Sequence, residues 1–269
     1  MIAIIQLAAV DYATGLRLQQ RLVELRKEGR IGDVLLLLEH TPVITLGRNA
    51  KAKNILASPD LLAQRRVEVF ECDRGGDVTF HGPGQVVGYP IFDLRTIASS
   101  QRKTLGAIEY VRRLEEALIR TCADFGIATR RIQGLTGVWT TKDPASPLAT
   151  TRGGEWQEAK IAAIGVHISR AVSSHGFALN VNTDLSYFDL IVPCGIQAKP
   201  VTSMKQELGR QVEIEQVAHA ISRNFGVVFE SQMLWLDRLD SLLGEKLGVP
   251  MKPPTELRRL HNEEETFWA

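Results

Sequence analysis

RVEVFECDRGGDVTFHGPGQVVGYPIFDL, residues 66–94, contains the change of pattern on which the fold assignment depends. Val67 and Val69 are two residues apart, which predicts a strand, and VVGYPIFDL at the other end predicts a second strand. The twelve residues between them, Arg74 to Gln85, hold four glycines and a proline and are expected to be loop-like at both ends. Pro90 favours a sheet edge or a bulge for the second strand.

The sequence on both sides of this stretch continues as strands with few helices. Strands are expected in MIAIIQLAAV at the N-terminus, in DVLLLLEH at residues 33–40 and in short apolar segments after residue 126. Helices are expected over residues 11–30, 104–125 and 214–225. The apolar face of the second helix consists of Leu105, Ile108, Val111, Leu114, Leu118, Cys122 and Phe125. The pattern therefore predicts a sheet-rich α/β chain.

The composition excludes several classes of protein. A formal net charge of +1 over 269 residues gives no overall basic field of the kind that nucleic-acid binding favours. The cysteines at 72, 122 and 194 are too far apart for a disulfide framework, and no CxxC pair indicates zinc. The longest internal apolar run, Val34 to Leu38, is far shorter than the roughly 20 residues that cross a bilayer. We expect reduced thiols, a cytoplasmic location, no metal site, and neither nucleic-acid nor membrane binding.

The chain is expected to form one main domain over residues 1–232 and a C-terminal extension over residues 233–269. The extension includes LWLDRLDSLLGEKLGV from Leu234, an amphipathic pattern that predicts a partly helical segment. Within the domain, Thr141 to Glu155 holds two prolines, two glycines and many small polar residues. A surface loop between two strands is expected there.

The glycine-rich segment Arg74–Gln85 is the first candidate for a functional site, because glycines let the backbone approach a ligand closely. It matches neither the Walker pattern nor the dinucleotide-binding pattern, which disfavours a phosphate site. His81 within it is, taken alone, more often a hydrogen-bonded structural residue than a catalyst.

Lys160 and Cys194 form the second candidate. Lys160 opens the apolar strand KIAAIGVHIS, where burial disfavours its charged form and makes it a candidate proton acceptor. Cys194 lies between Pro193 and Gly195, in a turn whose backbone N–H groups can stabilise an oxyanion. A free thiol has a pKa of about 8.5, so a neighbouring base is needed to supply the thiolate. Taken alone, either residue is more often structural, and sequence spacing cannot bring the two together.

Six motifs in the same order resemble the lipoyl(octanoyl) transferase family, over residues 35–228. They are LLLLEHTPVITLGR, RGGDVTFHGPGQVVGYPIFDL, TGVWT, KIAAIGVHI, HGFALNVNTDLSYFDLIVPCGI and VTSM. The resemblance implies the fold of the biotin and lipoate protein ligases, a mixed β-sheet flanked by helices. The loop at 141–155 is longer than the family's usual connection, and the extension lies outside the family's common core.

The resemblance also implies the site and its chemistry. Cys194 is the acyl-thioester nucleophile, and Lys160 lowers the pKa of the Cys194 thiol and acts as general acid and base. The octanoyl group arrives on the phosphopantetheine arm of acyl carrier protein, with no other cofactor. It leaves on a lysine of a lipoyl domain, in an E2 subunit of a 2-oxoacid dehydrogenase or in the glycine cleavage H protein. The implied substrate-binding residues are Arg74, Gly75, Gly76, Asp77, Val78, Thr79, Phe80, His81, Ala163, Ile164, Gly165, Gly176, Phe177 and Ala178.

Two features of this chemistry stay open in the sequence. The oxyanion donors are either the N–H groups near Cys194 or those of Gly75 and Gly76. The basic surface expected to meet the acidic carrier protein is either Arg48, Lys51 and Lys53 or Arg112, Arg113 and Arg120.

Three other functions compete with this one. An ATP-dependent lipoate or biotin protein ligase of the same fold would adenylate a free acid and would not need Cys194, but the chain lacks the GRGRxG loop of biotin ligases. A related transferase would take its octanoyl group from a glycine-cleavage protein. A non-catalytic acyl-binding module would use the glycine-rich segment for a lipid and Cys194 for packing.

Overall fold

The computed structural model describes residues 1–98, 104–141, 158–193, 199–237 and 239. The loop expected over residues 141–155 lies outside the described residues except for Thr141. Cys194 and nearly all of the C-terminal extension lie outside them as well.

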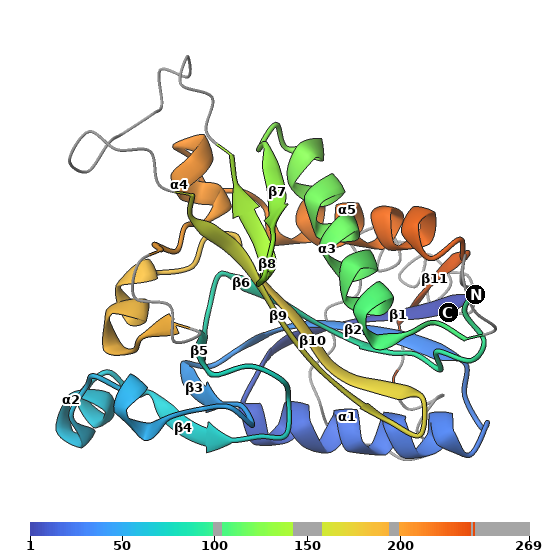
Figure 1. Ribbon diagram of the computed structural model, residues 1–269, viewed down its shortest axis with the longest axis horizontal. Coiled ribbons are helices and arrows are strands. Elements are labelled where there is room, and N and C mark those ends of the chain that lie inside the picture. The colour runs from blue at the N-terminus through green and yellow to red at the C-terminus, as the bar shows by residue number, and fades with distance from the viewer. Residues whose placement is uncertain (99–103, 142–157, 194–198, 238, 240–269) are drawn as a thin grey trace, which may run out of the picture.

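An eight-stranded mixed sheet forms the centre of the molecule (Figure 1). Its strand order is β11-β1-β2-β6-β10-β9-β8-β7, with β11, β1 and β2 parallel and the other neighbours antiparallel. The strands are β1 (Ile2–Val10), β2 (Asp33–His40), β6 (Gln85–Ile91), β7 (Thr129–Ile132), β8 (Leu135–Thr140), β9 (Lys160–Ser169), β10 (Val172–Asn180) and β11 (Met233–Leu236).

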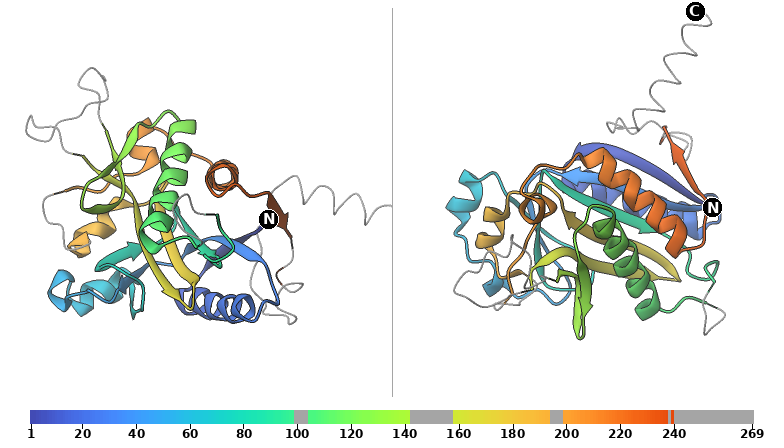
Figure 2. Two further views of the ribbon diagram at one scale, coloured as in Figure 1. Left: turned by 45° about the vertical axis from the view of Figure 1, so that its right-hand side comes forward. Right: turned by 90° about the horizontal axis from the view of Figure 1, so that it is seen from above.

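Helices cover both faces of this sheet. α3 (Ala107–Asp124) and α5 (Ile214–Val228) pack together on one face, and α1 (Tyr12–Lys27) lies on the other (Figures 1 and 2). β2 shows why its apolar run is continuous: Leu35 and Leu37 belong to the core under α3 and α5, whereas Leu36 belongs to the core under α1. A strand buried on both faces has no polar side to alternate with. The expected α/β class with a mixed, helix-flanked sheet is confirmed.

A three-stranded sheet, in the order β4-β3-β5, lies beside the main sheet. Its strands are β3 (Val43–Leu46), β4 (Glu68–Glu71) and β5 (Val78–His81). Short helices accompany it or follow later in the chain: η1 (Ala52–Asn54), α2 (Pro59–Gln64), η2 (Leu185–Leu190) and α4 (Met204–Leu208). Strand β5 occupies the middle of the glycine-rich segment, so only the two ends of that segment are loop-like.

Pro90 lies inside the sheet, so the sheet-edge alternative is wrong. β6 has β2 on one side and β10 on the other. The pairing of β6 with β10 covers Gln85 to Gly88, is interrupted opposite Pro90 and resumes with a bridge between Asp93 and Val172, while pairing with β2 continues through Leu35 and Pro90. The missing N–H of proline therefore falls in a gap of the ladder with β10.

Ile108 is also misplaced by the periodicity. It was expected on the buried face of α3 but is 74% exposed, although Leu105 before it and Tyr110 after it are buried.

Over its first three residues, the helix expected from Leu234 is instead a strand: β11 pairs with β1, from Ile2–Met233 to Ile5–Leu236. An unpaired edge of β1 was available, and its ladder hydrogen bonds outweigh the helical pattern of these residues. Residues 240–269 lie outside the described residues, so a partly helical extension stays a prediction.

Candidate active site

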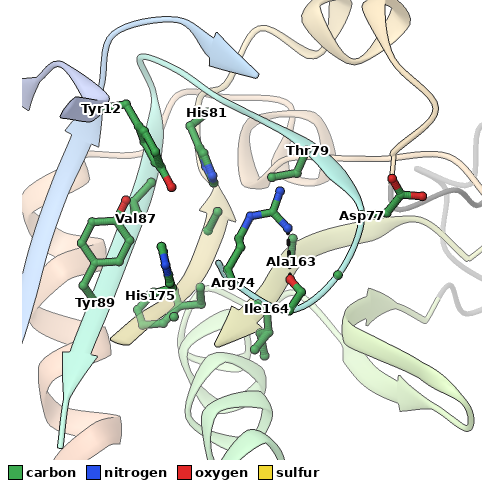
Figure 3. A pocket seen from close by; sticks show the side chains of 16 residues that line it. Tyr12, Arg74, Asp77, Thr79, His81, Val87, Tyr89, Ala163, Ile164 and His175 are labelled. Carbon is green, nitrogen blue, oxygen red and sulfur yellow. Dashed lines mark hydrogen bonds between the residues drawn. The ribbon is translucent and has the colours of Figure 1, made fainter. Parts of the chain in front are cut away.

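A cavity of about 480 Å³, partly open to solvent, is walled by the Arg74–His81 segment and by strands β9 and β10 (Figure 3). Twelve of the fourteen residues expected to bind substrate line it. They are Arg74, Gly75, Gly76, Asp77, Thr79, His81, Ala163, Ile164, Gly165, Gly176, Phe177 and Ala178. Three separate stretches of sequence thus meet around one space, and their role in binding remains a prediction.

Val78 and Phe80 do not line this cavity. They alternate with Thr79 and His81 along β5 and are 0% and 1% exposed on its opposite side, in a cluster with Phe188. Successive side chains of a strand point to opposite faces, and no strand was expected in the middle of this segment.

Four other residues line the cavity and were not singled out in the sequence: Tyr12, Val87, Tyr89 and His175. Tyr12 is the first residue of α1, and its ring lies parallel to that of His81 with the ring centres 6.3 Å apart. His175 has a φ of 54°, in the left-handed region that non-glycine residues rarely adopt. The sequence carried no signal for this conformation, which turns a residue of β10 into the wall of the cavity.

The glycine-rich segment lies directly against β9. A methyl group added at Gly165 would come within 2.7 Å of the carbonyl oxygen of Gly75. The Gly75 N–H donates to the carbonyl oxygen of Val166 at 3.0 Å. The backbone of the segment therefore requires glycine at 165, and the Gly75 N–H is already used within the fold. Of the two glycines considered as oxyanion donors, only Gly76 remains.

Arg74 anchors the same segment from inside. It is 8% exposed, and its guanidinium donates to the carbonyl oxygen of Thr45 at 2.7 Å, to the Thr45 hydroxyl at 2.8 Å and to the carbonyl oxygen of Gly75 at 3.1 Å. These bonds tie the cavity wall to strand β3. Arg74 thus contributes a charge to the cavity and also fixes its shape.

Hydrogen bonds define the protonation states of His40 and of His81, which lines the cavity. Nδ1 of His40 lies 3.0 Å from the carbonyl oxygen of Val10, which only accepts, so Nδ1 carries the proton. Nε2 of His40 then accepts from the Tyr89 hydroxyl at 2.6 Å. Burial lowers the pKa of His40 to about 4, which leaves its ring neutral at pH 7.

His81 is fixed by a second chain of hydrogen bonds. The side-chain amide of Gln85 donates to Asn180 Oδ1 at 2.9 Å, which leaves Gln85 Oε1 to accept from His81 Nδ1 at 2.8 Å. Burial, with a smaller contribution from nearby His40, lowers the pKa of His81 to about 3. The neutral ring therefore presents Nε2 as an acceptor, and Figure 3 shows it pointing toward the cavity.

Lys160 lies in a neighbouring cavity of about 280 Å³. Its side chain is almost completely buried, with 6% of the residue exposed, and Nζ lies 4.7 Å from the ring centre of Trp139. Pro193, the last described residue before Cys194, lines this second cavity as well. Thr79, Ala163 and Ala178 line both cavities, so the two spaces adjoin.

Cys194 itself lies outside the described residues. Of the other two cysteines, Cys122 lies on the buried face of α3, and burial raises the pKa of its thiol to about 12. Cys72 is half-buried, and its thiol donates to the carbonyl oxygen of Leu46 at 3.4 Å. Cys122 is thus a packing residue, as the sequence indicated.

The described residues contain no group of three histidine, cysteine or acidic side chains arranged to hold a metal ion. None of the helices among them is long and apolar enough to cross a membrane.

Residues 11–226 match a family described as the lipoyl protein ligase A/B catalytic domain. An octanoyltransferase of Koribacter versatilis is 60% identical over 264 residues, which cover 98% of each chain. An octanoyltransferase of Acidobacterium capsulatum is 58% identical over 90% of this chain and 96% of its own.

Solved structures give the same fold at much lower identity. A bipartite lipoate protein ligase of Thermoplasma acidophilum, solved as part of a lipoylation system with its E2 lipoyl domain, is 16% identical. It covers 91% of each chain with a TM-score of 0.61. LipL1 of P. falciparum in complex with lipoate is 14% identical, covers 91% of this chain and 69% of its own, and has a TM-score of 0.63. The expected ligase-like fold is confirmed.

Proposed function

This chain belongs to the octanoyltransferases of the lipoyl protein ligase A/B catalytic domain family, and we propose that it moves an octanoyl group from a carrier-protein thioester to a lysine of a lipoyl domain. The donor in this proposal is octanoyl-acyl carrier protein. The acceptors are lipoyl domains of E2 subunits and the glycine cleavage H protein. The intermediate is a thioester on Cys194.

The position of Lys160 is the observation that carries this proposal. A buried lysine shares a cavity with Pro193, and a peptide bond separates consecutive Cα atoms by only about 3.8 Å. The next residue is Cys194. The adjoining larger cavity, walled in part by alanines and glycines, has room for an acyl chain. A nucleophile, a proton acceptor and an acyl pocket would then be contiguous.

The chemistry proceeds in two acyl transfers. Lys160 takes the proton of the Cys194 thiol, and the thiolate attacks the octanoyl thioester. The C–S bond to phosphopantetheine breaks, and the departing thiolate takes up the proton. The neutral amine of the lipoyl-domain lysine then attacks the enzyme thioester and gives up a proton to Lys160. The C–S bond to Cys194 breaks, and Lys160 returns the proton to the departing Cys194 thiolate. Each step passes through a tetrahedral oxyanion, which backbone N–H groups stabilise.

The energetics of this route need no nucleotide. Exchange between two thioesters is nearly balanced, and transfer from a thioester to an amide is downhill. A ligase, in contrast, must first spend ATP to activate a free acid. Dependence on ATP therefore separates the two functions.

An assay with two donors tests the proposal. The enzyme is mixed with an unmodified lipoyl domain and either octanoyl-acyl carrier protein without ATP or free octanoate with ATP, and the mass of the lipoyl domain is followed. We expect modification with the first donor only, and a rate at least about 100-fold lower for Lys160→Ala, because general acid–base catalysis typically contributes that much. Modification that requires ATP would replace this function with that of a ligase.

The basic side chains Arg48, Lys51 and Lys53 are proposed to meet the acidic carrier protein. They are exposed, and no described acidic side chain lies within ion-pair distance of them. Their segment borders the cavity: the Lys51 N–H donates to Asp77 at 3.3 Å, and the Arg48 N–H donates to the carbonyl oxygen of Arg74 at 3.0 Å.

The alternative surface on α3 is less suitable. Arg113 pairs with Glu109 at 3.0 Å and Arg120 with Glu116 at 2.9 Å, so much of its charge is already compensated. Both surfaces can be compared directly by replacing each set of three basic residues with glutamine.

Replacing Arg48, Lys51 and Lys53 should raise KM for octanoyl-acyl carrier protein roughly 10-fold with little change in kcat, because each rim charge is worth about 0.5 kcal/mol. Wild-type KM should rise with ionic strength, and the KM of this variant should rise less. The matched variant at Arg112, Arg113 and Arg120 should stay close to wild type. A KM independent of salt in the wild-type enzyme would remove the docking role.

A further inference from the structure

The indole ring of Trp139 lies beside the side-chain nitrogen of Lys160 in the interior of the protein. Lys160 Nζ is 4.7 Å from the ring centre, within the roughly 6 Å over which an aromatic face attracts a cation. Trp139 is 1% exposed and Lys160 6%, so water hardly competes with this contact. Both belong to TGVWT and KIAAIGVHI, motifs that the resemblance used without giving the tryptophan a role.

The backbone of β8 is shaped to allow the contact. Trp139 is paired with Lys160 across β8 and β9, and the register shifts between Val138 and Trp139. Gly137 has a φ of 123°, and a methyl group added there would come within 2.7 Å of the carbonyl oxygen of Ala162 and 3.4 Å of Lys160 Cε. The lysine stem therefore runs across a glycine to reach the ring.

Other charged groups surround the same ring. Lys199 Nζ lies 5.7 Å from the ring centre and is held at 2.6 Å by the carboxylate of Glu158. Glu115 lies behind Gly137, where its Oε1 accepts from the Gly137 N–H at 3.0 Å. Its other oxygen pairs with Arg131 at 3.1 Å. Glu158 and Arg131 thus compensate Lys199 and Glu115, and of the two lysine Nζ atoms over the ring, that of Lys160 is the nearer.

We propose that Trp139 is a positioning residue for the acyl transfer: its ring face holds the Lys160 side chain and stabilises the ammonium group that forms when Lys160 takes the thiol proton. This inference rests on the proton-transfer role proposed above for Lys160. It predicts that the electron density of the ring, and not only its volume, sets the rate of Cys194 acylation.

Fluorinated tryptophans separate these two properties, because fluorine withdraws electron density from the ring face and changes its shape very little. The enzyme is produced with mono-, di- and trifluorotryptophan, and formation of the octanoyl adduct is followed in a single turnover with octanoyl-acyl carrier protein. The rate should fall stepwise with fluorine content, by up to about 30-fold. In a Trp139→Phe background, fluorination of the remaining tryptophans should leave the rate unchanged.

A double-mutant cycle tests whether Trp139 acts through Lys160. Trp139→Leu should slow acylation about 30-fold, and Trp139→Phe should restore part of the rate, because phenylalanine keeps an aromatic face. In Lys160→Ala enzyme, Trp139→Leu should have no further effect. Trp235→Leu, on the edge strand β11, is the matched control and should acylate at the wild-type rate. Thermal unfolding of each variant verifies that it is folded.

The outcomes distinguish the inference from the function on which it rests. A rate independent of fluorination, or a Trp139→Leu effect of equal size with and without Lys160, would overturn the positioning role alone. Wild-type acylation by Lys160→Ala would overturn the proton-transfer role and the inference with it. Stepwise loss on fluorination together with a non-additive cycle would support both.

Discussion

His40 and His81 show how individual residues in and next to the cavity wall are kept uncharged. Their rings are 5.9 Å apart, and each is buried with one nitrogen bonded to an acceptor of the fold. Two protonated rings at this distance would repel each other in a region with little water. They therefore shape the cavity as neutral hydrogen-bonding groups.

The neutral state of His40 predicts a loss of stability in acid. Above pH 6.5, the ordinary pKa of histidine, neither the folded nor the unfolded chain binds a proton there. Between pH 6.5 and about 4 the unfolded chain binds a proton at His40 that the folded chain does not. The contribution of neutral His40 to the free energy of unfolding is therefore lost as the pH falls through this range. The slope is about 1.4 kcal/mol per pH unit, or roughly 3 kcal/mol in total.

Urea unfolding at several pH values between 7.5 and 4.5 measures this effect. His40→Asn should be less stable than wild type at pH 7.5, because it loses the bond that orients Tyr89. The difference should shrink as the pH falls, because asparagine does not titrate. Parallel stability curves for the two proteins would show that His40 is not kept neutral by the fold.

Among the elements, β11 has the clearest consequence for stability. It covers the edge of β1 from Ile2 to Ile5, and Leu239 beyond it is 3% exposed in the core under α1. A chain that ends at Gln232 would leave this edge of β1 without a partner. Met233–Leu236, which the sequence assigned to an extension, thus takes part in the main sheet.

Two truncations test the contribution of β11. A chain ending at Gln232 should be at least about 2 kcal/mol less stable than a chain ending at Leu239, because it loses a buried leucine as well as the strand. Urea unfolding of both truncated chains and the full chain gives the comparison. Equal midpoints for the two truncations would mean that residues 1–232 form a self-sufficient domain, as the sequence alone predicts.

The elements that the sequence predicted are those with long, regular apolar patterns. The continuous apolar run DVLLLLEH predicted β2, and Leu114, Leu118 and Cys122, each four residues apart, predicted α3, because a local apolar pattern reflects burial directly. β5 was missed because glycines and a proline flank only four strand residues. The place of Pro90 depended on where the ladder with β10 is interrupted, which no local pattern encodes.

At the scale of the whole molecule, the candidate site is assembled from residues far apart in the chain. Arg74, Ala163 and Gly176 line one cavity because the small sheet lies against the main sheet at β9 and β10. Their spacing in the sequence carries no such information, and only the resemblance to a family grouped them. Tyr12 and His175 were missed for the same reason, since each reaches the cavity only through tertiary packing.

The central claim is that octanoyl passes through a thioester on Cys194 with the help of Lys160. The most direct measurement is the intact mass of the enzyme after mixing with octanoyl-acyl carrier protein in the absence of ATP, for wild type, Cys194→Ser and Lys160→Ala. We expect a hydroxylamine-sensitive octanoyl adduct on wild type, its absence from Cys194→Ser, and slow formation on Lys160→Ala. An enzyme that modifies lipoyl domains without any adduct, or an adduct that persists in Cys194→Ser, would contradict this claim.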